Sequence, residues 1–122
     1  MRFLIYFGAH AMDDIPQDQM VDVARAAHAT CQDAINAGVY VLAGGILETP
    51  ADIVHTDGSV TEGDYPDAIG GFTVIDVEDR EEALRWAAKI AVACRCAQEV
   101  REIGFDSELA DMLEEATRRN LK

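Results

Sequence analysis

Apolar residues recur along the chain with two different spacings, one typical of strands and the other typical of helices. Segments rich in aromatic and β-branched residues, or alternating apolar with polar positions, predict strands at residues 2–7, 39–43, 72–77 and 97–103. Apolar residues spaced three or four positions apart predict amphipathic helices at residues 16–37, 79–94 and 106–119. The predicted order is therefore strand–helix–strand, then a second strand–helix–strand, and a final helix.

Several boundaries have a chemical signal of their own. Gly38 follows the last apolar residue of the first helix, where glycine commonly ends a helix. Asp79, with Glu82 three residues later, forms a capping-box-like start for the second helix. Residues 52–62 predict a hairpin, because the Asp57-Gly58 pair at its centre tolerates the positive φ of a tight turn.

The order of these elements predicts an α+β fold. Two strand–helix–strand halves of similar length favour a ferredoxin-like βαββαβ antiparallel sheet with both helices on one face, plus an inserted hairpin and a C-terminal helix. The other face of such a sheet, if apolar, needs a cover, and a second sheet packed face to face provides one. We therefore expect a homodimer, with assembly beyond the dimer left open. Residues 1–104 are expected to form one domain, and residues 105–122 an amphipathic helix packed on that domain or on the dimer partner.

Composition and charge exclude some classes of partner. The chain has 122 residues, 49% of them hydrophobic, and a net charge of −13. Residues 1–78 hold 13 acids and two bases, whereas residues 79–122 hold ten acids and eight bases. Such a charge repels phosphate backbones and anionic lipids, so neither nucleic acid nor a membrane is an expected partner. The apolar N-terminus is too short for a signal peptide, and a cytoplasmic location is expected.

Cysteines and histidines give no metal or cofactor signal. The three cysteines are an odd number, and Cys94 and Cys96 are separated by one residue, whereas zinc and thiol-redox sites usually have at least two between their cysteines. We predict reduced, structural thiols. His10 and His55 have acidic neighbours but no defined ligand spacing, so no metal is expected. No glycine-rich phosphate loop is present, and no cofactor is expected.

Short segments spread over residues 2–103 occur in a characteristic order and spacing. They are Phe3-Leu4-Ile5-Tyr6, Arg25-Ala26-Ala27-His28, Gly38 to Gly44, Thr56-Asp57-Gly58, Gly70-Gly71-Phe72 and Glu99-Val100-Arg101. In this order they resemble the YCII-related family, including its DGPF-type branch. The resemblance implies a dimeric α+β barrel and a histidine–aspartate site, with some members acting as lyases or dehydrochlorinases on small aromatic or enolic compounds. Where that branch has Asp-Gly-Pro-Phe, this chain has Glu62-Gly63-Asp64-Tyr65-Pro66.

His28 is the first candidate for catalysis. It lies four residues after Ala24 and three before Cys31, on the apolar stripe of the first helix, so its side chain is expected to point toward the sheet. An imidazole there can move a proton near neutral pH. Asp52 matches the acid that follows the second strand in the YCII pattern and would orient His28. The alternatives are a core histidine bonded to a carbonyl, an exposed loop aspartate, and Glu48 in place of Asp52.

Four more residues are candidates for substrate binding. Tyr6 lines a cleft or fills the core, and Arg101 binds an anionic substrate or pairs with Glu99 or with a partner chain. Asp64 and Tyr65 hold a polar substrate group, or Asp64 forms a turn. Two functions fit these residues. One is a cofactor-independent lyase or isomerase acting on a small phenolic or enolic compound through His28 and Asp52. The alternative is a non-catalytic dimeric module that binds a small ligand or a partner and in which His28 is structural.

Overall fold

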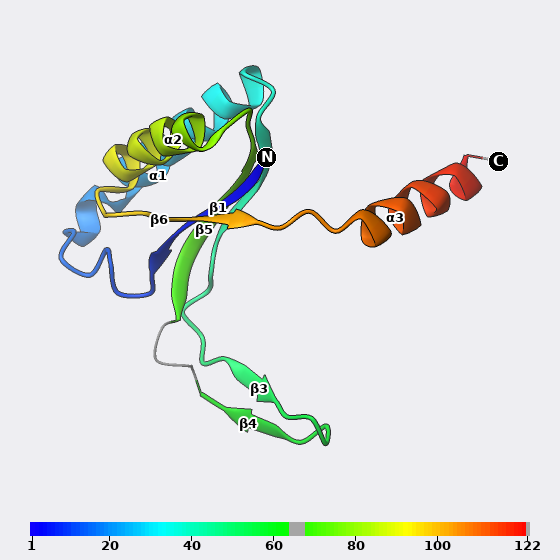
Figure 1. The fold of residues 1–122 in the computed structure, drawn as a ribbon. Helices are drawn as coiled ribbons and strands as arrows, with labels where there is room; N and C mark the ends of the chain where they lie inside the picture. The colour runs from blue at the N-terminus through cyan, green and yellow to red at the C-terminus, as the bar shows by residue number, and fades with distance from the viewer. Residues whose placement is uncertain (64–67, 122) are drawn as a thin grey trace.

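A four-stranded sheet and two helices form the body of the protein in the computed structural model, which describes residues 1–63 and 68–121 (Figure 1). The strands of the main sheet are β1 (Arg2–Gly8), β2 (Tyr40–Gly45), β5 (Ile69–Asp76) and β6 (Glu99–Ile103). The helices are α1 (Met20–Asn36), preceded by a 3-10 turn at Gln17–Gln19, α2 (Arg80–Cys94) and α3 (Ser107–Asn120). A separate hairpin is made by β3 (Asp52–Val54) and β4 (Val60–Glu62).

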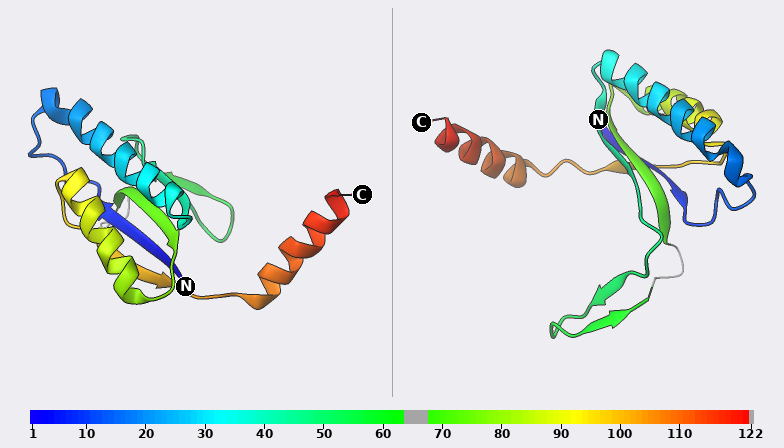
Figure 2. Two further views of the ribbon diagram at one scale, coloured as in Figure 1. Left: turned by 90° about the horizontal axis from the view of Figure 1, so that it is seen from above. Right: turned by 180° about the vertical axis from the view of Figure 1, so that it is seen from behind.

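The main sheet has the strand order β2-β5-β1-β6, and each neighbouring pair is antiparallel. Both α1 and α2 cover the same face of it (Figures 1 and 2). This is the ferredoxin-like arrangement that the order of elements predicts, with the hairpin inserted between β2 and β5. The predicted fold class and the predicted hairpin are confirmed.

The core lies between the sheet and the two helices. Phe3 and Ile5 of β1 and Ile75 of β5 are fully buried there, and Phe3 is the register partner of Ile75. Because side chains of a strand alternate between its faces, these residues place every second position of β1 and β5 against the helices. Each such side chain stabilises the fold by roughly 1.5–3 kcal/mol.

Helix α2 begins where its sequence signal predicts. The backbone N–H of Glu82 donates to Asp79 Oδ1 at 2.8 Å, and Glu82 Oε2 accepts from the backbone N–H of Glu78 at 3.0 Å. The helix ends at Arg95, which has a left-handed φ of 57°. Its buried face consists mostly of small side chains, which lets it pack close to the sheet: Ala83, Ala87, Ile90, Ala93 and Cys94.

The opposite face of the sheet is covered by neither α1 nor α2 (Figure 2). By alternation it carries apolar side chains from all four strands, namely Leu4, Leu42, Val74 and Ile103. We call these residues the open sheet face. Charged side chains border them: the guanidinium of Arg2 donates to both carboxylate oxygens of Asp76 at 2.7 Å. This is the face for which the sequence predicts a cover.

Two elements project away from the body, the β3–β4 hairpin and α3 (Figures 1 and 2). The hairpin turns at Gly58, whose φ of 86° suits glycine. Helix α3 follows Gly104–Asp106 and points outward from the end of β6, so it does not pack on its own domain. Across the described residues, no helix is long and apolar enough to cross a membrane.

Candidate functional site

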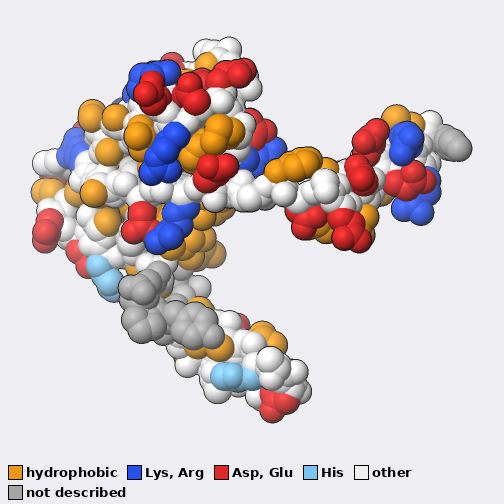
Figure 3. Space-filling view, viewed as in Figure 1, with side chains coloured by type: hydrophobic (Ala, Val, Ile, Leu, Met, Phe, Trp, Pro, Cys, Tyr) orange, Lys and Arg blue, Asp and Glu red, His pale blue; other side chains and the backbone are white. Residues whose placement is uncertain are grey.

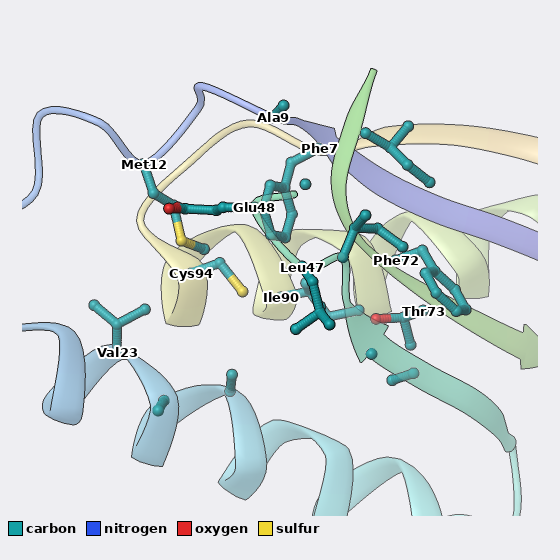
Figure 4. A pocket seen from close by; sticks show the side chains of 18 of the residues that line it. Phe7, Ala9, Met12, Val23, Leu47, Glu48, Phe72, Thr73, Ile90 and Cys94 are labelled. Atoms are coloured by element: carbon teal, nitrogen blue, oxygen red, sulfur yellow. The ribbon is translucent and has the colours of Figure 1, made fainter. Parts of the chain in front are cut away.

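A hollow of about 1710 Å³ lies beside α1, between the end of the sheet where β2 ends and β5 begins and the connection from β2 to β3 (Figure 4). Its walls are mostly apolar and come from α1, α2, β1, β2 and β5. Figure 4 shows Phe7 near its centre, Leu47 and Glu48 entering from the β2–β3 connection, and Val23 facing them from α1. An apolar hollow with a few polar groups is the usual form of a small-molecule site.

Two glycines in β5 make room for Phe7. A Cβ at Gly70 would lie 2.9 Å from Phe7 Cε2 and 2.9 Å from the carbonyl oxygen of Gly8. A Cβ at Gly71 would lie 2.6 Å from Phe7 Cζ. Real Cβ atoms do not approach other atoms so closely, so the phenyl ring lies against the bare backbone of β5. The Gly70-Gly71 pair therefore sets the shape of this wall.

A β-bulge in β2 forms another wall. Tyr40 pairs with Ile75 and Leu42 with Val74, so the strand holds one extra residue at Val41. The extra residue lets Tyr40 face the helices while Leu42 lies on the open sheet face. The Tyr40 hydroxyl accepts from the backbone N–H of Ala43 at 3.1 Å, which holds its ring across the bulge.

His28 lies on α1 and lines the hollow, but its side chain is exposed rather than buried in the core. The buried residues of α1 are Val23 and Ala34. The expectation of a histidine turned fully toward the sheet therefore needs correction: His28 lies at the solvent side of the hollow. Over the described residues, its ring makes no hydrogen bond or ion pair, so both ring nitrogens are open to a ligand.

The structure does not bring Asp52 to this hollow. Asp52 is the first residue of β3, is exposed, and lies opposite Glu62 in the hairpin. Glu48, the alternative carboxylate, does line the hollow (Figure 4). The sequence places both acids in one connection, and only the path of that connection decides which of them lines the hollow.

Tyr6 and Arg101 meet on the other side of the sheet. Arg101 Nε donates to the Tyr6 hydroxyl at 2.9 Å and to Glu99 Oε2 at 3.1 Å, and the same hydroxyl is hydrogen-bonded to Glu99. Ile5, next to Tyr6, faces the helices, so Tyr6 faces away from them. Within one chain, Tyr6 and Arg101 are therefore separated from His28 by the sheet. Of the alternatives for Arg101, the pairing with Glu99 is present within the chain.

Other predicted residues fall at the edge of the hollow or outside the described chain. Asp64 and Tyr65 lie outside the described residues. His10 and Asp13, both lining the hollow, interact through His10 Nδ1 and Asp13 Oδ2 at 2.9 Å. Thr73 lines the hollow although it is only 8% exposed. Thr73 is a polar residue within the apolar run 72–77, and it was not recognised from this pattern as a candidate site residue.

The thiols are free, as their spacing predicts. Cys31 and Cys94 line the hollow, and burial raises the pKa of both, that of Cys94 to about 11. Both are therefore neutral near pH 7 and serve as soft apolar walls. In the part of the chain that the structure describes, no three His, Cys, Asp or Glu side chains are placed to hold a metal ion.

Fold and site together define a ferredoxin-like α+β protein with a hollow on the helix side of its sheet. A sequence model of the YCII-related domain matches residues 1–104, so the chain belongs to the YCII-related family. The resemblance found in the sequence is thereby confirmed. Helix α3 lies beyond the matched region.

A solved structure shares this fold. It is 5-chloro-2-hydroxyhydroquinone dehydrochlorinase (TftG) from Burkholderia phenoliruptrix AC1100, in complex with 2,5-dihydroxybenzoquinone. The TM-score is 0.51 at 20% identity, covering 88% of this chain and 98% of the other. At this identity the likeness establishes the shared fold. A search of curated proteins found no significant match.

Proposed function

We propose that the hollow binds a small phenolic or enolic compound and that His28 moves a proton in a lyase or isomerase reaction. The observation that carries the proposal is the hollow itself, with apolar walls that suit a ring and an unpaired imidazole at its solvent side. Its volume exceeds the ~300–1,000 Å³ of most ligand sites. A small ring would therefore occupy only part of it.

The chemistry needs no redox partner. A base that removes the hydroxyl proton of a phenol or enol leaves an enolate. The electron pair of the enolate then takes a proton at carbon, which is isomerisation, or expels a leaving group such as halide from the adjacent saturated carbon, which is elimination. His28 would accept the first proton and, as imidazolium, return it to carbon in the isomerisation or release it to water in the elimination. A fold shared with a dehydrochlorinase supports this class of reaction without specifying the substrate.

We assign Glu48 as the carboxylate that orients His28. A base needs a group that holds its ring, and Glu48 and His28 both line the hollow, whereas Asp52 begins the hairpin. This assignment replaces the His28–Asp52 pair of the sequence analysis. Tyr6 and Arg101 have no part in the hollow of their own chain.

The alternative function is a binding module without catalysis. Its support is the absence, over residues 1–63 and 68–121, of a hydrogen bond between His28 and any carboxylate. In such a module the hollow would hold a ligand, and His28 would contribute only a polar contact.

A homodimer is part of this proposal. The open sheet face is apolar at Leu4, Leu42, Val74 and Ile103, and Leu42 is 54% exposed. A second copy packed on this face would remove those side chains from water in both chains at once. The border of charged pairs, such as Arg2 with Asp76, would fix the register of the two sheets.

The test combines binding with proton transfer. Melting temperature is measured with and without 2,5-dihydroxybenzoquinone or simple hydroquinones for wild type and for His28→Asn. His55→Asn is the matched control, because His55 is also exposed but lies in the hairpin, where its Nε2 contacts Thr61 Oγ1 at 2.9 Å. A ligand at 100 times its Kd stabilises the native state by about 2.7 kcal/mol. NMR in D₂O then follows hydrogen–deuterium exchange at the ring carbons.

For an enzyme we expect wild type and His55→Asn to be stabilised and to accelerate ring exchange, whereas His28→Asn stays folded and loses the acceleration. Glu48→Gln should lower the exchange rate more than Asp52→Asn. Stabilisation without exchange in wild type would support the binding module instead. A wild-type protein that none of these compounds stabilises contradicts both functions of the hollow.

A further inference from the structure

Helix α3 carries an apolar stripe with no partner in its own chain. Leu109, Met112 and Leu113 have the spacing of one helix face and are 59%, 59% and 69% exposed. Phe105, in the segment before the helix, is 85% exposed. Figure 3 shows the helix standing clear of the body with apolar side chains on its surface. We call Phe105, Leu109, Met112 and Leu113 the α3 stripe.

The helix is too short to be stable without packing. It has 14 residues, and isolated helices below ~12–15 residues are marginal in water. Its ends are well capped, since the backbone N–H of Leu109 donates to Asp106 Oδ1 at 3.0 Å and Arg118 and Arg119 lie in the last turn. Caps add only ~1 kcal/mol, however. A persistent α3 therefore needs a surface on which to bury its stripe.

The whole chain exposes more surface than a compact monomer of its size. A folded monomer of 13.3 kDa is expected to expose about 6,500 Å². This chain exposes 8968 Å², an excess of about 2,500 Å² over the monomer expectation. Obligate homodimers bury ~2,000–5,000 Å² over both copies, or about half of that per chain. The excess thus matches the area that a second copy would cover.

We infer that α3 is an exchanged arm whose stripe docks on a second copy of this chain. The segment Gly104–Asp106 continues outward from β6, an edge strand whose Ile103 lies on the open sheet face, so α3 extends that same surface beyond its own body. In a symmetric dimer, each copy contributes one α3 arm and one surface that receives the arm of its partner, so no further copy is added. This inference rests on the proposed homodimer and adds to it an interface outside the YCII-related region.

The experiment measures mass and hydrogen exchange on the full chain. Sedimentation gives the mass of wild type over a dilution series, and hydrogen exchange of residues 107–120 is followed at concentrations above and below dimer dissociation. In the dimer we expect exchange of α3 to be at least ~10-fold slower than in the monomer. Leu113→Glu should raise the dimer dissociation constant about a hundredfold, because both copies lose a buried leucine.

Val92→Glu is the matched control. Val92 is 80% exposed on α2, and the same change there should leave the dissociation constant within about twofold. Four outcomes would overturn the inference: a dimer whose α3 exchanges freely, α3 protection that persists in the dilute monomer, an effect of Leu113→Glu no larger than that of Val92→Glu, and a chain monomeric at all concentrations. The first three leave the proposed dimer intact, whereas the fourth removes both. None of them bears on ligand binding in the hollow.

Discussion

Replacing Gly71 by alanine should drive the ring of Phe7 toward the hollow. The new Cβ would lie 2.6 Å from Phe7 Cζ, 2.8 Å from Cε1 and 3.3 Å from the carbonyl oxygen of Gly44. Favourable carbon–carbon contacts are ~3.5–4.0 Å, so the ring must move by about 1 Å. The carbonyl oxygen of Gly44 limits the movement of the new methyl group away from the ring in another direction. The side chain that yields is therefore Phe7.

The magnitude follows from overpacking, which typically costs ~1–3 kcal/mol. Phe7 is half-buried and packs against the core, so we expect a loss of about 2 kcal/mol in the free energy of unfolding. For a domain of this size that corresponds to roughly 6–10 °C in melting temperature. Urea unfolding measures the loss directly, as a lower midpoint with an unchanged slope.

Gly45→Ala is the control, because Gly45 is the register partner of Gly71 but a Cβ there would meet nothing within 4 Å. It should change stability by less than about 0.5 kcal/mol. In a Phe7→Leu background the ring atoms that clash are gone, so Gly71→Ala should also cost less than about 0.5 kcal/mol there. Equal costs of Gly71→Ala in both backgrounds, or equal costs of the two alanine variants, would refute the packing argument.

Two further predictions follow from the pKa directions. Because burial raises the pKa of Cys94 to about 11, its thiolate fraction at pH 8 is about a hundredth of that of a thiol at 9.0. Iodoacetamide followed by mass spectrometry should find Cys94 alkylated at least ~100-fold more slowly than a small free thiol; equal rates would contradict its burial. The hydrogen bond from Arg2 lowers the pKa of Asp76 below 3.8, so this pair stabilises the fold above that pH and loses its effect as the pH falls through the lower, folded-state value. Because both side chains are about half exposed, a double-mutant cycle with Arg2→Met and Asp76→Asn should give a coupling energy of less than ~1 kcal/mol at pH 7. The coupling energy should become smaller as the pH falls below 3.8, and a coupling energy that grows in acid would contradict the lowered pKa of Asp76.

Features with a local cause could be predicted from the sequence. The hairpin turn depends on neighbouring residues only: Gly58 takes a positive φ, and the backbone N–H of Ser59 donates to Asp57 Oδ1 at 2.9 Å. The start of α2 likewise depends on Asp79 and Glu82, which lie within four consecutive residues. The sheet order followed because two similar strand–helix–strand halves leave few arrangements.

The orientation of His28 could not be predicted as well, because α1 is rich in alanine. Alanines at positions 24, 26, 27, 29 and 34 surround His28 and give a nearly uniform pattern, so several stripes fit the helix equally well. The stripe that predicts His28 toward the sheet includes Ala24, which is exposed, whereas the fully buried residues of α1 are Val23 and Ala34. His28 lies five positions after Val23, so at about 100° per residue it lies roughly 140° from Val23 around the helix, toward the solvent side of the hollow.

The sequence alone also does not decide between Glu48 and Asp52 as the partner of His28. Both follow β2 in a connection without regular periodicity, and its path is held by contacts distant in sequence, such as the bond from the Ile46 N–H to the Gly70 carbonyl at 2.9 Å. No residue near Ile46 in the sequence predicts its hydrogen bond to Gly70.

The division of the sheet into two faces carries the strongest constraint on function. Phe7, with the bare backbone of Gly70 and Gly71, builds a hollow on the helix side, whereas the neighbouring residue, Tyr6, contributes to a charged cluster on the other side. Adjacent residues of one strand therefore serve different surfaces, because the side chains alternate. A ligand held by His28 cannot touch Arg101 of the same chain without crossing the sheet. If Arg101 acts on a ligand at all, that ligand lies on the open sheet face, and the proposed dimer would enclose it between two copies.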